Sequence, residues 1–130
     1  YVELAYAKEN QLPMALIKNA AGNFVAPSVQ SITAAAAGVA DKLPPNTDYR
    51  ISIINAPGAQ AYPISSFTWA LVYKNPRDAA KSKTLVNFLR YGLSAEGQRA
   101  AVALDYASLP ETMRSGVLAR LDSVSPATNR

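Results

Sequence analysis

The residue types that most enzymatic chemistry requires are sparse in this 130-residue chain. Cysteine and histidine are both absent, which removes disulfides, Cys/His zinc sites and nucleophile–base pairs built on either residue. There are only 6 glycines, and none of the glycine-rich phosphate-binding motifs occurs. We therefore expect no catalytic residue, no metal ligand and no cofactor in this chain.

Carboxylates are the remaining candidates for acid–base chemistry. Three pairs lie close together in the sequence: Glu3 with Glu9, Asp41 with Asp48, and Asp105 with Glu111. A glycosidase-type site needs two carboxyl groups on either side of the bond that is cleaved. Scattered carboxylates are more commonly surface charges or helix caps, and that is the interpretation we favour.

Ser65 and Ser66 are the candidates for ligand contact, because they directly precede an apolar, strand-like run. The alternative, which we favour, is that both hydroxyl groups bond the local backbone. Within the run, Trp69 and its aromatic neighbours alternate as in a strand. We expect them in the core rather than on a platform that stacks a ligand.

Composition narrows the class of protein further. The chain is 49% hydrophobic and 17% charged, which is typical of a globular protein, and it holds no apolar run of the ~20 residues that a membrane span needs. The formal charge of +4 is spread over scattered residues, the densest group being 74–83, so we expect no nucleic-acid partner. The chain opens without an initiator methionine or a visible leader, and we expect it to be a segment of something longer.

Secondary-structure signals place mixed elements in the first half of the chain. A short helix within 1–11 should stop at Pro13, and strands at 14–17 and 24–25 should flank a turn at 19–23. Ser28 is a suitable N-cap for the alanine-rich helix that follows, and Gly38 is placed to end that helix.

The second half is expected to hold two strands and three helices. After a loop at 41–48, the run 49–54 is β-branched, and 66–73 is apolar on both faces, as in a fully buried strand. Helices should start after Asp78, after Ser94 and at a capping box spanning 108–111, and the polar tail 125–130 should fray.

The three C-terminal helices carry more apolar surface than this chain can cover. Their stripes are Leu85, Val86, Phe88, Leu89 and Leu93; then Ala100, Ala101 and Leu104; then Met113, Val117, Leu121 and Val124. One strand cannot cover three such stripes. The sequence therefore predicts an α/β architecture from which part of the sheet is missing.

Several landmarks of the chain resemble one known family. They are the stretches Tyr1–Asn10, Asn19–Val25, the Pro27-Ser28 helix start with its alanine run, Asn55–Gly58, Ala61–Thr68, Leu71–Lys74 and Leu104–Pro110. In this order and spacing the chain resembles the phosphate ABC transporter substrate-binding proteins, the PstS family, and specifically their C-terminal portion.

The resemblance implies a periplasmic-binding-protein fold of type II, in which two α/β lobes close on phosphate. Residues 1–61 would end the second lobe, residues 62–130 would return to complete the first, and the hinge would cross at Gln60 to Pro63. The family's phosphate contacts lie in the N-terminal half, so none is assigned to this chain.

The implied partners are inorganic phosphate, a membrane ABC permease and the N-terminal half of the same protein, in the periplasm or at the cell surface. The implied role is non-enzymatic. The alternatives are a scaffold fragment of a phosphate-ester-processing relative and a non-binding cleavage product.

Overall fold

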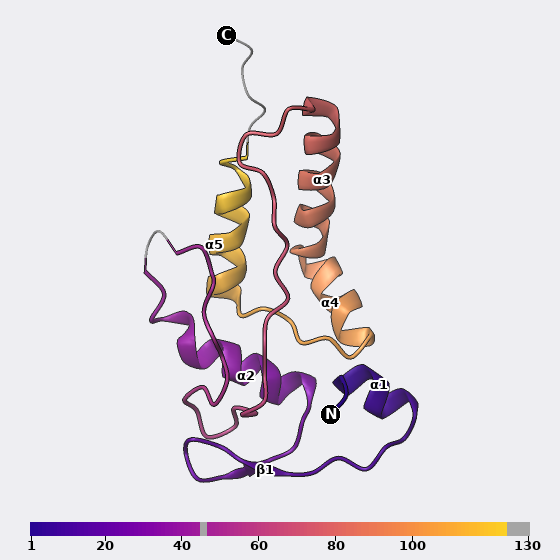
Figure 1. Ribbon diagram of the computed structural model, residues 1–130, viewed down its shortest axis with the longest axis vertical. Coiled ribbons are helices and arrows are strands. Elements are labelled where there is room, and N and C mark those ends of the chain that lie inside the picture. The colour runs from indigo at the N-terminus through magenta and orange to yellow at the C-terminus, as the bar shows by residue number, and fades with distance from the viewer. Residues whose placement is uncertain (45–46, 125–130) are drawn as a thin grey trace.

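The computed structural model describes residues 1–44 and 47–124. Within those ranges the chain forms five α-helices and one two-stranded sheet (Figure 1). In chain order these are α1 (Leu4–Glu9), β1 (Ile17–Lys18), β2 (Phe24–Val25), α2 (Val29–Ala40), α3 (Ala79–Gly92), α4 (Ala95–Ala103) and α5 (Glu111–Leu121). The predicted tail 125–130 and positions 45–46 of the predicted loop lie outside the described residues.

The predicted turn at 19–23 joins two short strands, of which the second lies where predicted and the first lies at Ile17–Lys18 rather than at 14–17. β1 and β2 pair antiparallel, with Ile17 opposite Val25 and Lys18 opposite Phe24. The turn closes through the Asn19 amide N–H, which donates to the Asn23 carbonyl at 2.8 Å. Gly22 adopts a φ of 86°, a conformation that side chains disfavour and glycine allows.

Helix α2 begins as predicted and ends later than predicted. The Ser28 hydroxyl accepts from the Ser31 amide, and the Ser31 hydroxyl accepts from the Ser28 amide, so the two form a reciprocal cap. The expectation that Gly38 ends the helix is wrong, because the helix continues to Ala40. Gly38 instead allows a close approach, since a Cβ atom there would overlap the Pro57 carbonyl oxygen.

Two of the three C-terminal helices start where predicted, after Asp78 and after Ser94, and of these two residues Ser94 was predicted as a cap. Asp78 accepts from the Lys81 amide and Ser94 from the Gly97 amide. The predicted capping box at 108–111 is wrong, since Pro110 is the N-cap of α5 and has no side-chain cap bond. The Ser108 carbonyl is instead an acceptor for the Thr33 hydroxyl of α2, at 3.0 Å.

The small core centres on α2. It joins Ala35, Ala36 and Val39 of that helix with residues of the segment 53–61 and with one residue of α5, namely Ile53, Ala56, Ala61 and Met113. Small side chains dominate the cluster, and they let backbone segments approach α2 closely.

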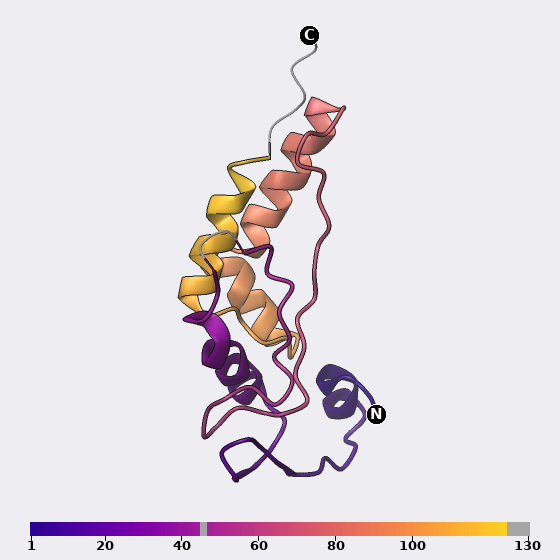
Figure 2. The same cartoon turned by 60° about the vertical axis from the view of Figure 1, so that its left-hand side comes forward.

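The expected strands at 49–54 and 66–73 do not form a sheet. Neither segment pairs with another strand among the described residues, and Figure 2 shows 66–73 as an extended trace along one side of the helices. The expectation of burial on both faces is wrong: Leu71 is 94% exposed and Tyr73 is 85% exposed. The physical reason is that a strand is buried by neighbouring strands, and the described residues place none beside this segment.

The expectation that Trp69 lies in the core is also wrong, because its side chain is 46% exposed. Its indole Nε1 donates to the Tyr49 carbonyl at 2.9 Å, and its ring meets Phe67 edge-on at 6.2 Å between centroids. These contacts hold the start of the extended segment near residue 49.

The helix stripes are only partly covered. Met113 and Leu121 of α5 are buried, whereas Phe88 of α3 is 69% exposed and Leu85 is 42% exposed. α3 contacts α4 and α5, which leaves its remaining apolar face open. None of the described helices is both long and apolar enough to cross a membrane.

Replacing Gly38 tests the close approach of α2 to residue 57. Gly38→Ala should lower the free energy of unfolding by about 1–3 kcal/mol, because the new methyl group must displace backbone. Gly92→Ala is the matched control, since a Cβ atom there meets nothing within 4 Å. It should leave stability unchanged or raise it by up to ~1 kcal/mol. Urea denaturation of the full-length protein measures both, and equal effects would contradict the packing described.

Candidate functional site

A cavity of about 840 Å³ lies between α1, α2 and two segments from the second half of the chain. Residues 62 and 64–68 form one wall and residues 105–109 form another. Helix α2 contributes Ile32 and Ala36, and both serines predicted as ligand candidates belong to the lining. This cavity is therefore the place where the sequence-based candidates can be assessed.

The walls of the cavity do not suit an anion. Among the described residues that line it, the charged ones are Glu3 and Asp105, and both are acidic. A phosphate needs several hydrogen-bond donors and benefits from a cation or a helix N-terminus. The Glu3 carboxylate would repel it, and the Asp105 carboxylate is already paired with Lys8.

The two candidate serines bond the nearby backbone. Ser65 is buried, and its hydroxyl donates to the Tyr62 carbonyl at 2.8 Å. Ser66 is exposed, and its hydroxyl donates to its neighbour's carbonyl, that of Phe67, at 3.3 Å. The geometry is that of local turn bonds, as in the alternative interpretation of the sequence.

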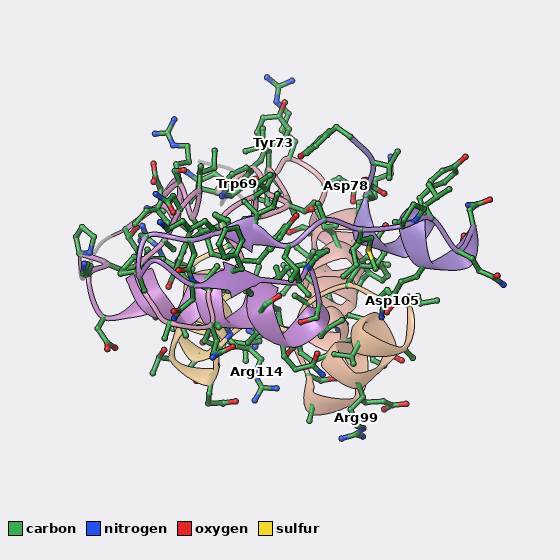
Figure 3. The ribbon with its side chains drawn as sticks, turned by 90° about the horizontal axis from the view of Figure 1, so that it is seen from below. Trp69, Tyr73, Asp78, Arg99, Asp105 and Arg114 are labelled. Carbon is green, nitrogen blue, oxygen red and sulfur yellow. The ribbon has the colours of Figure 1, made fainter. Side chains whose placement is uncertain are left out.

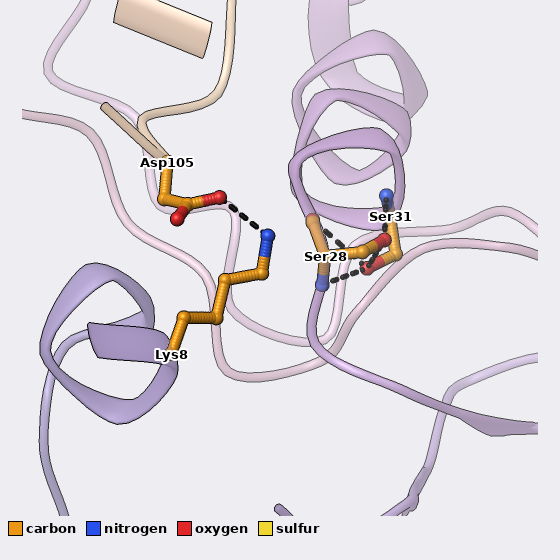
Figure 4. A network of polar contacts seen from close by, with 4 residues as sticks. All are labelled: Lys8, Ser28, Ser31 and Asp105. Atoms are coloured by element: carbon orange, nitrogen blue, oxygen red, sulfur yellow. Dashed lines mark hydrogen bonds and ion pairs between the residues drawn. The ribbon is translucent and has the colours of Figure 1, made fainter. Parts of the chain in front are cut away.

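An ion pair closes one edge of the cavity. Lys8 of α1 pairs with Asp105, which follows α4 (Figure 4). Asp105 has a φ of 61°, a left-handed conformation that Asp and Asn tolerate better than most residues. The two side chains are 41% and 29% exposed, so solvent screens the pair. The partners lie 97 positions apart, and no local signal in the sequence could have joined them.

Three of the six candidate carboxylates are held in ion pairs, which fits the favoured interpretation that they are surface charges. Asp105 pairs with Lys8, and Glu111 pairs with Arg114. Arg50 donates to Asp48 at 2.7 Å, and this hydrogen bond lowers the pKa of the Asp48 carboxyl. Within the described residues, no group of three or more acidic side chains is placed to hold a metal ion.

A second, smaller cleft of about 400 Å³ lies between α4 and α5. Arg99 and Arg114 line it together with Glu111, and Figure 3 shows the two arginines toward the same side of the molecule. Glu111 already neutralises Arg114, and Arg99 is exposed to solvent. Among the described residues, this cleft therefore offers no buried, unpaired positive charge that could bind an anion.

Comparisons with known proteins come from curated relatives, since no protein-family model matches the chain. A protein of Xylella fastidiosa described as "Phosphate-binding protein PstS" is 38% identical over 113 residues, covering 87% of this chain and 30% of the relative. Proteins of the same description from Methanocaldococcus jannaschii and Haemophilus influenzae are 38% and 34% identical, over 85% and 90% of this chain. They are matched over 31% and 34% of their own length, so the chain spans about a third of the relatives.

The Lys8–Asp105 pair should make a small, salt-sensitive contribution to stability. Lys8→Gln and Asp105→Asn should each lower the free energy of unfolding by less than ~1 kcal/mol, because the pair is partly exposed. Asparagine is used because it tolerates the positive φ. The double variant should lose less than the sum of the two, and the difference should vanish in about 1 M salt. Additive losses at low salt would contradict the pairing.

Proposed function

This chain belongs to the PstS family of phosphate-binding proteins, and from that premise we propose that it is the C-terminal part of a solute-binding protein that binds phosphate and delivers it to an ABC permease. The observation that carries the proposal is identity of 34–38% to relatives of that description over most of this chain. The role is binding rather than catalysis, and its location is the periplasm or the cell surface.

The proposed fold of the whole protein is the two-lobe, type II periplasmic-binding-protein fold. Residues 1–61 end the second lobe, and residues 62–130 return to complete the first. The extended segment 66–73 supports this proposal. Among the described residues, none of the backbone amides of 67–73 donates to a backbone carbonyl. Unpaired backbone amides of this kind are typical of a strand whose neighbouring strands are absent.

Exposed apolar side chains lie on the same segment and on the next helix. Leu71 and Tyr73 are almost fully exposed, and Phe88 of α3 is largely exposed. Surfaces of this kind are covered in stable proteins, and two thirds of the relatives' length lies outside the matched region. The partner that we propose for this surface is the N-terminal part of the same protein.

The phosphate contacts, in this proposal, lie in that N-terminal part. The charged side chains among the described lining of the cavity beside Ser65 and Ser66 are Glu3 and Asp105, of which Asp105 is paired with Lys8. Both serine hydroxyls already donate to backbone carbonyls. Phosphate binding by the complete protein requires donors and a cation that these walls do not offer. Neither serine is proposed as a ligand.

Calorimetric titration with inorganic phosphate tests where the ligand contacts lie. The full-length protein should bind phosphate in the presence of excess sulfate, and this chain alone should give no specific heat of binding. Ser65→Ala and Ser66→Ala in the full-length protein should leave the phosphate Kd unchanged, because both hydroxyls bond backbone. Specific binding by the isolated chain, or a weakened Kd in either variant, would place contacts within this chain.

Reconstitution from two parts tests the proposed partner. The isolated chain should bind a hydrophobic dye, because large apolar side chains are exposed. Adding the N-terminal part in trans should remove the dye signal and raise the melting temperature, and phosphate should raise it further, because a ligand of the native pair stabilises that pair. A sharp, dye-free, monomeric transition of the isolated chain would contradict the proposal.

A further inference from the structure

Positive charge is concentrated in the segment 74–83, which is the loop before α3 and the first turns of that helix. The segment has a formal charge of +3, and the whole chain has +4. Figures 1 and 2 place it at one end of the long axis, away from α1 and α2. Its basic residues, which we name the basic cluster, are Lys74, Arg77, Lys81 and Lys83.

The cations of the basic cluster are exposed and mostly unpaired. The side chains of Lys74, Arg77 and Lys83 make no ion pair or hydrogen bond with another described residue. Lys81 is the exception, since its Nζ lies 3.8 Å from a carboxylate oxygen of Asp78. These two side chains are 88% and 52% exposed, so solvent screens the pair. The positive charge of the cluster is therefore left largely unneutralised.

Basic side chains elsewhere in the described chain are more often held by a carboxylate. Those in ion pairs are Lys8, Arg50, Arg90 and Arg114. The segment 74–83, in contrast, has four cations and the single acid Asp78. Cations gathered in this way repel one another, and a negatively charged partner relieves that repulsion.

The start of α3 adds to the positive potential of the cluster. Unpaired N–H groups give a helix N-terminus a partial positive charge, and cations placed there destabilise the helix. Lys81 nevertheless lies in the first turn of α3, which holds no acidic residue, and Lys83 follows in the second. The N-cap Asp78 accepts from the Lys81 amide at 3.0 Å, so its carboxylate is engaged with the helix end. The sequence thus places two lysines where the helix alone favours acids.

We expect the basic cluster to remain exposed to water in the complete protein. Removing unpaired ammonium and guanidinium groups from water is costly, and the centres of protein interfaces are depleted of lysine. The apolar side chains for which we propose a cover, such as Leu71 and Phe88, lie outside the segment 74–83. The cluster is therefore available to a partner other than the N-terminal part of the protein.

The chemistry of the cluster favours an anionic lipid surface over an acidic protein. Three of its four cations are lysines, whose ammonium group is a hydrated point charge without the planar fork that lets arginine pair with carboxylates. The segment 74–83 has no aromatic or large aliphatic side chain to anchor a protein partner, and none of its residues lines either cavity described above. Clusters of four or more Lys and Arg residues are typical of contacts with anionic headgroups.

We propose that the basic cluster is a contact site for the anionic phosphate headgroups of a lipid bilayer. The contact is electrostatic and reversible, because each cation near an anionic membrane strengthens binding by only about fivefold. The proposal goes beyond the proposed function and rests on it for its purpose alone, which is to keep a phosphate carrier close to the membrane that holds its permease.

Sedimentation of the full-length protein with lipid vesicles tests the contact. The protein should bind vesicles that mix phosphatidylglycerol with phosphatidylcholine, and it should not bind vesicles of phosphatidylcholine alone. Salt at about 0.5 M should release it, because screening then limits the reach of the charges to about 4 Å.

The double variant Lys81→Gln with Lys83→Gln tests the cluster itself. It should bind the mixed vesicles about 25-fold more weakly, at about fivefold for each charge removed. Both side chains are exposed and glutamine is a good helix former, so the melting temperature should not fall. The matched control is Lys18→Gln with Lys42→Gln, which removes the same charge from two exposed lysines that make no ion pair within the described chain. The control should bind the vesicles as the wild type does.

Each remaining outcome decides the proposal. Failure of the unmodified protein to bind the mixed vesicles would overturn it, and so would equal losses in the two double variants. Binding only to vesicles that carry the permease would also overturn it and would indicate an acidic protein surface as the partner. Calorimetry with inorganic phosphate separates this inference from the proposed function: absence of phosphate binding would overturn that function and leave the vesicle result standing.

Discussion

The structure depends on one constraint: an extended apolar segment has no strand beside it. Strands satisfy their backbone donors and acceptors by pairing, and 66–73 has no pairing partner among the described residues. The exposure of Leu71 and Tyr73 follows from that, and so does the open face of α3. The PstS proteins that this chain resembles are matched over about a third of their length. We propose that the rest of the protein covers the exposed segment.

Around α2, by contrast, the chain is closely packed and hydrogen-bonded. Alanines on that helix bring the segment 53–61 close enough to bury Ile53 almost completely, and Gly38 admits the Pro57 carbonyl. Hydrogen bonds from the Asn19 side chain and to the Ser31 carbonyl then hold residues 58–62 in place. The protein therefore combines a closely packed core around α2, to which Met113 of α5 also belongs, with an extended segment whose backbone amides are unpaired from Phe67 to Tyr73 among the described residues.

Local chemistry was predictable from the sequence, and long-range pairing was not. Ser28 and Ser94 cap helices as predicted, because capping depends on residues three positions apart, and α3 starts after Asp78 as predicted. The end of α2 was wrong because the role of Gly38 is set by residue 57, which is distant in sequence. The buried strand at 66–73 was wrong because a strand is buried by neighbouring strands, and the described residues place none beside it. The missing sheet inferred from the excess of helix stripes stays a prediction. At the candidate site, the local bonds of Ser65 and Ser66 were foreseen, whereas the Lys8–Asp105 pair and the Asn19 network had no signal within a short window.

The most direct test of this account is the protection of the backbone amides of 67–73 against hydrogen exchange, measured in the isolated chain and in the full-length protein. The account predicts exchange near the rate of an unstructured chain in the isolated form, because these amides have no backbone acceptor there. It predicts strong protection in the full-length protein, where neighbouring strands accept their protons. Protection in the isolated chain, or its absence in the full-length protein, would contradict the claim that this segment is a strand completed by the rest of the molecule.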